Sequence, residues 1–426
     1  MDLIKRAYAL LGDWKKDDYV FGMGVLGQLG EVVKRYGQKV MVVSMDTFLK
    51  ELTDRAMASI EAAGCRLVPD TVVLGAKPNA PREDVYRLES YLLHYEPDCV
   101  VVIGGGSAID ACKAAIILAA YGRQVTPEID DYFGTGMVTR AAEDTGKSMI
   151  PLIAVETSAS SGAHLTKYSN ITDPVAGQKK LIVDPAITPR AALFDYETTM
   201  SMPVSVSVDG ALDAISHTFE VFCGAKPENY DLAKDLAETA IELTVAYTPA
   251  MIDNPRDAVA REALGLATDL GGYAIMIGGT SGAHLTSFSL VDLVAHGTAC
   301  GIMNPYYAVF YSPAIQPQLA VVGNILKKYG FIVKDPESLE GRERAEEVAR
   351  GLMAFGRAIG APTRLKDVKG FQEEHVHRIL EAAKDPQLSM KLQNMPIPMT
   401  GEDVEPYMGP IIRAAVDGDL KGIVNK

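Results

Sequence analysis

The sequence predicts an α/β chain in which a domain with a parallel sheet precedes an all-helical domain. Over the first half, short β-branched runs alternate with helical stretches, the pattern of a parallel sheet covered by helices. Beyond Met202, strand-like runs become scarce and long amphipathic stretches dominate. A chain of 426 residues is also long enough for two domains with separate cores. We therefore expect an α/β domain over residues 1–199 and an all-α domain over residues 200–426.

The local patterns predict individual elements of both domains. The expected strands of the first domain are Lys39–Ser44, Thr71–Leu74, Cys99–Ile103, Met149–Val155 and Ala191–Phe194. The helices expected between them are Ala80–Tyr95 and Ala108–Tyr121. Apolar periodicity in the second domain predicts helices over Ser207–Cys223, Asn229–Tyr247, Arg256–Ile277, Gly341–Ile359 and Gln372–Ala383. Ligands usually bind in the cleft between two such domains.

The chain is acidic, with a formal net charge of −14. An acidic surface repels nucleic-acid phosphates, so we expect no nucleic-acid partner. Five scattered cysteines without a CxxC pair indicate reduced thiols, not a disulfide framework. Charges interrupt residues 1–20, and no apolar run approaches the length of a membrane span. We therefore expect a cytoplasmic protein with no signal peptide and no membrane partner.

A three-glycine turn separates a buried-strand pattern from a helix start at Gly104-Gly-Gly-Ser-Ala-Ile-Asp110. Glycines let the backbone approach a pyrophosphate, and free N–H groups at a helix start bind it. Ser107 can cap this helix or donate to a phosphate. A tight turn without a ligand would use the same residues, so both interpretations stay open.

An earlier segment, Gly22-Met-Gly-Val-Leu-Gly27, competes with this turn because it fits GxGxxG. Asp46 follows it at the distance of a ribose-binding acid. The run before it, Tyr19–Phe21, is a poor strand, and an isolated GxGxxG is a weak signal. We rank this segment second.

Four residues of the second domain form a candidate metal site. Asp213 and His217 lie four apart in a predicted helix and so share one face. By itself this pair is better explained as a water-facing helix surface. His284 and His296 change the balance, because both lie in apolar surroundings where an unpaired imidazole is costly. Together the four predict an Asp-His-His-His site for Fe²⁺ or Zn²⁺, which would activate a bound hydroxyl or polarise a carbonyl.

These motifs, in this order, resemble the iron-containing alcohol dehydrogenase family, in the superfamily that also holds glycerol dehydrogenases and dehydroquinate synthases. The similarity runs from Gly22 to Met399, and its most specific segments are Gly104–Asp110, Asp209–Glu220, His284 and His296–Gly297. The resemblance implies a Rossmann-like dinucleotide-binding domain, a helical domain and a metal site in the cleft between them. It also implies hydride transfer between a small alcohol or aldehyde and NAD or NADP.

The resemblance further implies roles for single residues. Asp213, His217, His284 and His296 match the family's metal ligands. The expected cofactor contacts are Asp46, Gly104, Gly105, Gly106, Ser107, Asp110, Thr157, Ser158, Ser161 and Lys179, with Lys180 as the close alternative to Lys179.

The chain departs from the family pattern at three places. Where relatives usually read Pro-Thr-Thr-x-Gly-Thr-Gly-Ser-Glu, this chain keeps the hydroxyls but introduces Glu156 and His164. For His164 we favour a local structural hydrogen bond. Phe288 stands where many relatives carry a histidine, so a proton relay at that position is absent. Asp46 comes one residue later than the ribose-binding acid of NAD-preferring relatives. If Asp46 reaches the ribose, it would repel a 2′-phosphate and favour NAD. If it turns away, NADP remains open.

The expected function is therefore metal-dependent oxidation of a small alcohol or reduction of an aldehyde. The alternative is a polyol or polyol-phosphate dehydrogenase of the same superfamily. A phosphate-specific pocket should show extra Lys or Arg near the metal helices, and Gly278–Gly301 contains none. A metallohydrolase would leave the glycine turn without a role, and a chain that had lost catalysis would not need the ligand set. Because relatives are often dimers, we expect a homo-oligomer.

Overall fold

The computed structural model describes residues 2–45, 47–173, 175 and 178–426. Its internal contacts divide the chain into two compact units. One unit is Gly12–Ser201, and the other combines the residues up to Leu11 with Met202–Lys426. The first is an α/β unit, and the second is helical over the part that the structure describes. The expected fold class, a parallel-sheet domain followed by a helical domain, is confirmed.

The α/β unit holds all the strands among the described residues, together with five α-helices. The strands are β1 (Tyr19–Gly22), β2 (Lys39–Ser44), β3 (Arg66–Leu67), β4 (Val73–Leu74), β5 (Cys99–Gly104), β6 (Gly134–Thr135), β7 (Leu152–Glu156), β8 (Tyr168–Asp173), β9 (Gln178–Val183) and β10 (Ala191–Asp195). The helices are α2 (Leu29–Val33), α3 (Lys50–Ala62), α4 (Arg82–Tyr95), α5 (Gly106–Tyr121) and α6 (Met137–Thr145).

The helical unit carries the remaining α-helices. They are α1 (Leu3–Gly12), α7 (Val204–Cys223), α8 (Tyr230–Asp253), α9 (Ala258–Ile277), α10 (Gly282–Ser287), α11 (His296–Phe310), α12 (Gln316–Lys328), α13 (Gly341–Ala358), α14 (Glu373–Ala383), α15 (Ser389–Gln393) and α16 (Gly409–Asp417).

The main sheet is parallel throughout its described strands, in the order β1-β10-β7-β5-β2-β3, with β4 also paired to β2. A small second sheet joins β6, β9 and β8. In the pairing of β5 with β7, Gly104 lies opposite Glu156. The carboxyl ends of these two strands are therefore neighbours, and the segments that follow them meet at one edge of the sheet.

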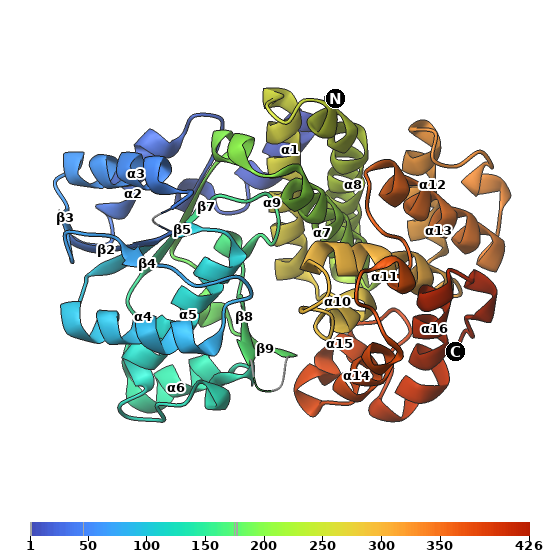
Figure 1. Cartoon of the computed structure of the whole chain (residues 1–426). Coiled ribbons are helices and arrows are strands. Elements are labelled where there is room, and N and C mark those ends of the chain that lie inside the picture. The colour runs from blue at the N-terminus through green and yellow to red at the C-terminus, as the bar shows by residue number, and fades with distance from the viewer. Residues whose placement is uncertain (1, 46, 174, 176–177) are drawn as a thin grey trace. The chain divides into compact units, whose positions relative to one another are not determined.

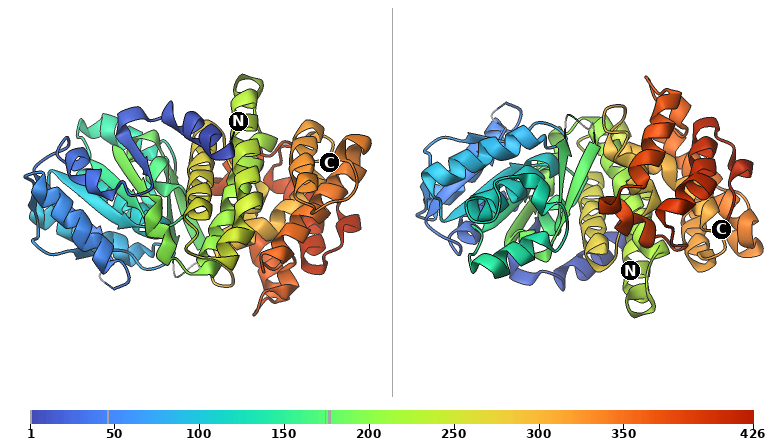
Figure 2. Two further views of the ribbon diagram at one scale, coloured as in Figure 1. Left: turned by 90° about the horizontal axis from the view of Figure 1, so that it is seen from above. Right: turned by 90° about the horizontal axis from the view of Figure 1, so that it is seen from below.

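Successive residues of the central strand β5 enter two separate cores. Val100 and Val102 pack with residues of α4 and α5, whereas Val101 and Ile103 pack with residues of α2 and α3. Figures 1 and 2 show these helix pairs on opposite faces of the sheet. Burial on both faces explains why the strand reads as a continuous apolar run in the sequence.

The prediction that Tyr19–Phe21 is a poor strand is wrong. These residues begin β1, which pairs in parallel with β10, with Tyr19 opposite Ala192. A strand of four residues has too little sequence pattern to stand out, and its hydrogen bonds come from a partner far along the chain. The two-residue strands β3 and β6 were missed for the same reason. The six-residue strands β8 and β9, which pair with each other in the small second sheet, were also not predicted.

The first helix, α1, belongs to the helical unit although it opens the chain. Arg6 forms ion pairs with Asp235 and Glu238 of α8 at 2.9 and 3.0 Å. Tyr8 Oη donates a hydrogen bond to Glu262 of α9 at 2.7 Å. The predicted domain limits, 1–199 and 200–426, follow chain order and so assign α1 to the first domain, whereas its contacts are with the helical unit.

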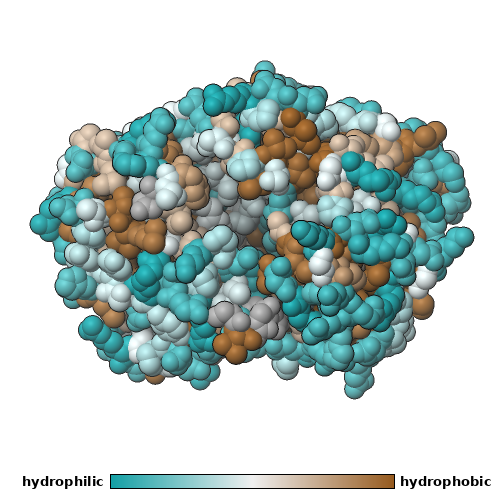
Figure 3. All heavy atoms as spheres, in the orientation of Figure 1, coloured by the Kyte–Doolittle hydropathy of each residue, from teal (hydrophilic) through white to brown (hydrophobic). Residues whose placement is uncertain are grey.

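None of the described helices combines the length and apolar character that a membrane-spanning helix requires. On the face drawn in Figure 3, hydrophilic residues are interspersed with smaller hydrophobic areas. The five cysteines are buried and form no disulfide, in line with the expected reduced thiols.

Candidate metal centre and cofactor-binding turn

The glycine turn lies directly against the hydroxyl-bearing segment that follows β7. A Cβ atom added at Gly105 would meet Ser158 Oγ at 2.6 Å, and one added at Gly106 would meet Ser161 Oγ at 2.5 Å. Any larger residue would have to displace these serines. The structure therefore brings together four of the predicted cofactor-contacting residues.

Helix α5 begins at Gly106, and no described side chain caps its N-terminus. Ser107 Oγ instead accepts a hydrogen bond from the backbone N–H of Asn79 at 2.9 Å. The N–H donors of the first helical turn are therefore not taken by a side chain. A helix start in this condition is suited to an anion such as a pyrophosphate.

Asp110 and the two candidate lysines lie nearby in the α/β unit. Asp110 is buried and accepts hydrogen bonds from Asn170, which ties α5 to β8. Lys180 is held by Asp130 and Asp173 at 2.8 and 3.4 Å. Burial raises the pKa of Asp110, and the charge of Lys179 is among the groups that lower it. The charge of Lys179 thus acts on Asp110 of α5, whereas Lys180 forms ion pairs with Asp130 and Asp173. Asp46 lies outside the described residues.

Glu156 and His164, the residues foreign to the family pattern, form a buried pair at the end of β7. His164 Nδ1 lies 3.1 Å from Glu156 Oε2, and His164 Nε2 lies 3.2 Å from Tyr19 Oη. The structural hydrogen bond expected for His164 is confirmed. Glu156 Oε1 accepts the backbone N–H groups of Thr157 and Ser158 at 3.0 and 2.9 Å, and Ser158 Oγ at 2.8 Å. The hydroxyl of Thr157 is therefore the donor left for a cofactor at these two residues, and Ser158 Oγ can only accept.

The competing glycine segment has its donors occupied. The N–H groups of Gly24 and Leu26 donate to the buried carboxylate of Asp195 at 2.8 and 2.9 Å. A negative charge already fills the place where a phosphate would bind. This geometry favours the turn at Gly104 for an anionic cofactor.

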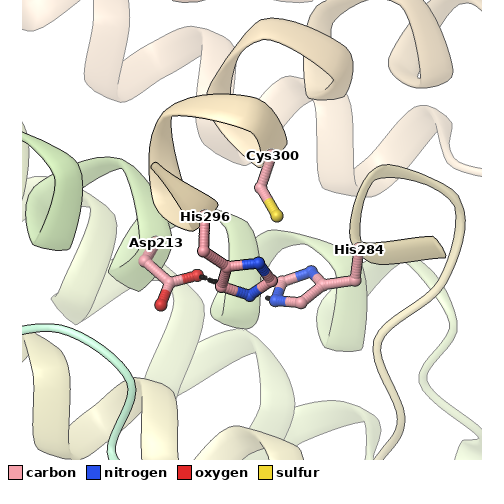
Figure 4. Close-up of side chains that lie close together, drawn as sticks. All are labelled: Asp213, His284, His296 and Cys300. Carbon is pink, nitrogen blue, oxygen red and sulfur yellow. Dashed lines mark ion pairs between the residues drawn. The ribbon is translucent and has the colours of Figure 1, made fainter. Parts of the chain in front are cut away.

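In the helical unit, three imidazoles converge on one buried carboxylate. The Nε2 atoms of His217, His284 and His296 lie 3.7, 3.6 and 3.8 Å from Asp213 Oδ1. Figure 4 shows Asp213, His284 and His296 with their polar atoms gathered at one point. Two donors each about 2.1 Å from one ion can be at most about 4.2 Å apart, and all three distances meet that limit.

Helices α7 and α11 approach closely enough to build this cluster because of one glycine. A Cβ atom at Gly297 would lie 2.0 Å from the carbonyl oxygen of Asp209 and 2.8 Å from Asp213 Cβ. The Asp209 carboxylate then accepts the N–H of Thr298 at 2.6 Å, near the start of α11. Asp209 thus docks the helix that carries His296 onto the helix that carries Asp213.

The outer nitrogens of two rings are held by hydrogen-bond partners. His284 Nδ1 lies 2.6 Å from Glu220 Oε1, and His296 Nδ1 lies 3.0 Å from Ser287 Oγ. Burial raises the pKa of Glu220, but His284 and the surrounding donors bring it below its ordinary value. Because an ionised carboxylate can only accept, a neutral His284 would carry its proton on Nδ1 and present the lone pair of Nε2.

The donor set therefore fits a metal cation. The lone pair of His284 Nε2 faces the carboxylate of Asp213, and this nitrogen makes no hydrogen bond within the described part of the chain. Two buried acceptors repel each other unless a cation lies between them. Burial, together with the charges of His284 and Lys391, lowers the pKa of His217 well below its ordinary value. Imidazole nitrogens grouped around a carboxylate are a donor set that suits a divalent ion.

Cys300 also lies at this cluster, although the sequence interpretation missed it. One ligand-type atom from each of Asp213, His284, His296 and Cys300 lies within 4.8 Å of the others, as Figure 4 shows. His296 and Cys300 are four residues apart on α11, and this spacing was the available signal. Burial raises the pKa of the Cys300 thiol well above its usual value. The thiol lies beside the imidazoles.

Comparison with known proteins assigns both halves of the chain to one family. Residues 17–196 match the model of the iron-containing alcohol dehydrogenases, and residues 207–409 match that family's C-terminal domain. The NAD-dependent methanol dehydrogenase of Bacillus methanolicus is 26% identical over 85% of this chain and 91% of that enzyme. The NADPH-dependent butanol dehydrogenase of Clostridium saccharobutylicum is 25% identical over 85% of this chain and 88% of that enzyme.

A solved structure shows the same fold. The alcohol dehydrogenase from Oenococcus oeni superposes with a TM-score of 0.79 at 22% identity, covering 94% of this chain and 98% of that one. The two family-model matches span the glycine turn at Gly104–Ser107 and the residues of the Asp-His-His-His cluster, respectively. This chain is thus a metal-dependent oxidoreductase of alcohols, and it belongs to the iron-containing alcohol dehydrogenase family.

Proposed function

We propose that the chain transfers a hydride between a small alcohol or aldehyde and NAD or NADP at an Fe²⁺ ion held by Asp213, His217, His284 and His296. The observation that carries this proposal is the convergence of three imidazole Nε2 atoms on the buried Asp213 carboxylate. The ion, when bound, supplies the Lewis acidity that polarises the substrate oxygen.

The residues of the α/β unit would bind and orient the cofactor. Its pyrophosphate would lie on the N–H groups of Gly104–Ser107, with Ser158 and Ser161 beside the turn and Lys179 at the ribose. In oxidation, the carbon that bears the hydroxyl loses a hydride to the nicotinamide, and the hydroxyl proton is released to solvent. The protein's contribution is orientation and electrostatics, because the cofactor carries the hydride.

The preferred cofactor and metal are finer points of the same proposal. The cofactor is NAD or NADP; an Asp46 that contacts the ribose hydroxyls would repel a 2′-phosphate and favour NAD, and one that turns away would leave NADP open. Turnover of both cofactors by Asp46→Ala would test this, since the variant should gain NADP activity relative to NAD. Fe²⁺ is favoured over Zn²⁺ by family membership. We also expect a homodimer located in the cytoplasm.

The deciding experiment is anaerobic turnover of chelator-stripped protein with short alcohols, before and after addition of Fe²⁺ or Zn²⁺. Activity should return with the metal and disappear in His284→Ala. His377→Ala is the matched control, because that histidine is exposed on α14 in the same unit. Failure to bind any nicotinamide cofactor would rule the proposal out.

A further inference from the structure

Lys391 is a buried lysine to which the proposed function assigns no role. It lies on α15 and is only 4% exposed. An ammonium group loses its hydration when it is buried, so other groups or a ligand must compensate for that loss. Burial lowers the pKa of Lys391 to about 8, with Glu220 and Cys300 acting in the opposite direction. A buried cation with a perturbed pKa is a candidate for a functional site.

Two contacts place this ammonium beside the candidate metal centre. Its Nζ donates a hydrogen bond to Thr280 Oγ1, four residues before His284 on the same segment. It also lies 5.6 Å from the centroid of the Phe288 ring. That ring stacks on His296, with centroids 6.3 Å apart and planes inclined by 17°. Lys391 therefore adjoins neighbours of two of the three imidazoles.

Lys391 adds a positive charge to the cluster that holds Asp213, Glu220 and the three histidines. The ammonium is a buried positive charge beside the candidate metal centre. In a weakly screened environment, such a charge attracts an anion strongly.

We propose that Lys391, together with the Thr280 hydroxyl, binds an anionic group of the substrate, so that preferred substrates are short alcohols or aldehydes bearing a carboxylate, sulfonate or phosphate. This inference rests on the proposed oxidoreductase function and narrows its substrate class. Hydride transfer occurs at the alcohol end, and the acid group passes through the reaction unchanged. Charge-assisted hydrogen bonds from an ammonium to such an oxyanion are short and strong.

The sequence around His284 and His296 does not reveal this cation. The segment Gly278–Gly301 around His284 and His296 contains no Lys or Arg, which argued against a phosphate-specific pocket. Lys391 lies on α15, which packs against α10. The composition of the segment does not include this cation, because the fold supplies it from a distant helix.

The test compares kcat/KM for acids and neutral alcohols of similar length. The acids are a hydroxypropionate, a hydroxyethanesulfonate and a hydroxyethyl phosphate, each with a terminal hydroxyl; the neutral compounds are propanol and propanediol. The proteins are the wild type, Lys391→Met, Lys391→Arg and, as control, Lys384→Met. Lys384 lies at the surface, where it pairs with Glu381 and Glu405. The same acids are titrated calorimetrically into each protein, so that binding is measured apart from turnover.

The wild type should prefer at least one acid over propanol by about 10- to 100-fold, the range of one charge-assisted hydrogen bond. Lys391→Met should lose that preference and the calorimetric binding, Lys391→Arg should recover part of both, and Lys384→Met should retain both. A wild type that prefers neutral alcohols, with the same ratio in Lys391→Met, would overturn the inference and leave the proposed function intact. Absence of turnover with every compound, despite bound metal and cofactor, would overturn the proposed function and this inference together.

Discussion

The two candidate sites of this chain, the cofactor-binding turn and the metal centre, use different kinds of chemical group. In the α/β unit, the turn at Gly104–Ser107 offers backbone N–H groups, and its fit depends on the absence of side chains at Gly105 and Gly106. In the helical unit, the centre at Asp213 consists of buried ionisable side chains from α7, α10 and α11. Cofactor binding at the turn depends on shape, and metal binding at Asp213 depends on charge. A mutation at one site should therefore leave binding at the other site unchanged.

The largest effect is expected at the carboxylate of the helical unit. Asp213→Ala removes the group on which the three imidazoles converge, and the ion would lose its only anionic ligand in the proposed set. We expect turnover to fall by more than about 1,000-fold. Metal content measured by mass spectrometry should fall with it, while cofactor binding measured by fluorescence should stay unchanged. Full metal occupancy in this variant would contradict the ligand assignment.

A charge effect of a different kind is expected in the α/β unit. Lys113 is buried and donates to the carbonyl oxygens of Ala163, Thr166 and Tyr168, each at 2.8 Å. Burial lowers its pKa from 10.5 to about 8. The folded protein therefore releases this proton at a lower pH than the unfolded chain does. Its contribution to the free energy of unfolding should rise as pH increases from about 8 to 10.5, by up to about 3 kcal/mol.

Lys113→Met provides the reference for that measurement. Denaturant unfolding of both proteins across this pH range should show the increase in the wild type and not in the variant, because other titrating groups are common to both. Parallel curves would contradict the assignment. A positive result would show that burial in the α/β unit disfavours the charged form of Lys113.

Shape is tested by Gly105→Ala. The added Cβ would lie 2.6 Å from Ser158 Oγ and would force the turn and the serine apart. We expect the KM for the dinucleotide to rise by about 10- to 100-fold, with metal content unchanged. Gly27→Ala is the control, because its Cβ would meet nothing within 4 Å. Equal effects in both variants would mean that the close approach at Gly105 has no special role.

The smallest effect is expected at Glu220→Gln. This variant keeps the shape of the side chain but removes the charge that holds His284 Nδ1 at 2.6 Å. Loss of such a supporting carboxylate should weaken metal binding by about tenfold. Competition with a chromogenic chelator would measure this. Unchanged affinity would show that Ser281 and the protein around His284 suffice to orient the ring.

Local patterns in the sequence predicted both the two-part architecture and most of the site. The continuous apolar run of β5 and the four-residue spacing between Asp213 and His217 follow from strand and helix geometry, so they can be read from neighbours in the chain. The glycine turn was visible for the same reason, because strand, glycines and helix start are contiguous. Its contact with Ser158 and Ser161 follows once β5 and β7 are known to be parallel neighbours.

Only the tertiary structure decided which distant groups complete these sites. Glu220 reaches His284, Cys300 joins the histidine cluster, and Lys391 arrives from α15 beside Phe288. Tyr19 likewise became part of a strand because β10 pairs with it. No periodicity links these partners, since their contacts depend on how separate elements pack. The sequence by itself thus determined the class of chemistry through residues arranged on single elements. The charge around the metal centre, and with it the choice of substrate, depends on contacts between elements that chain order does not reveal.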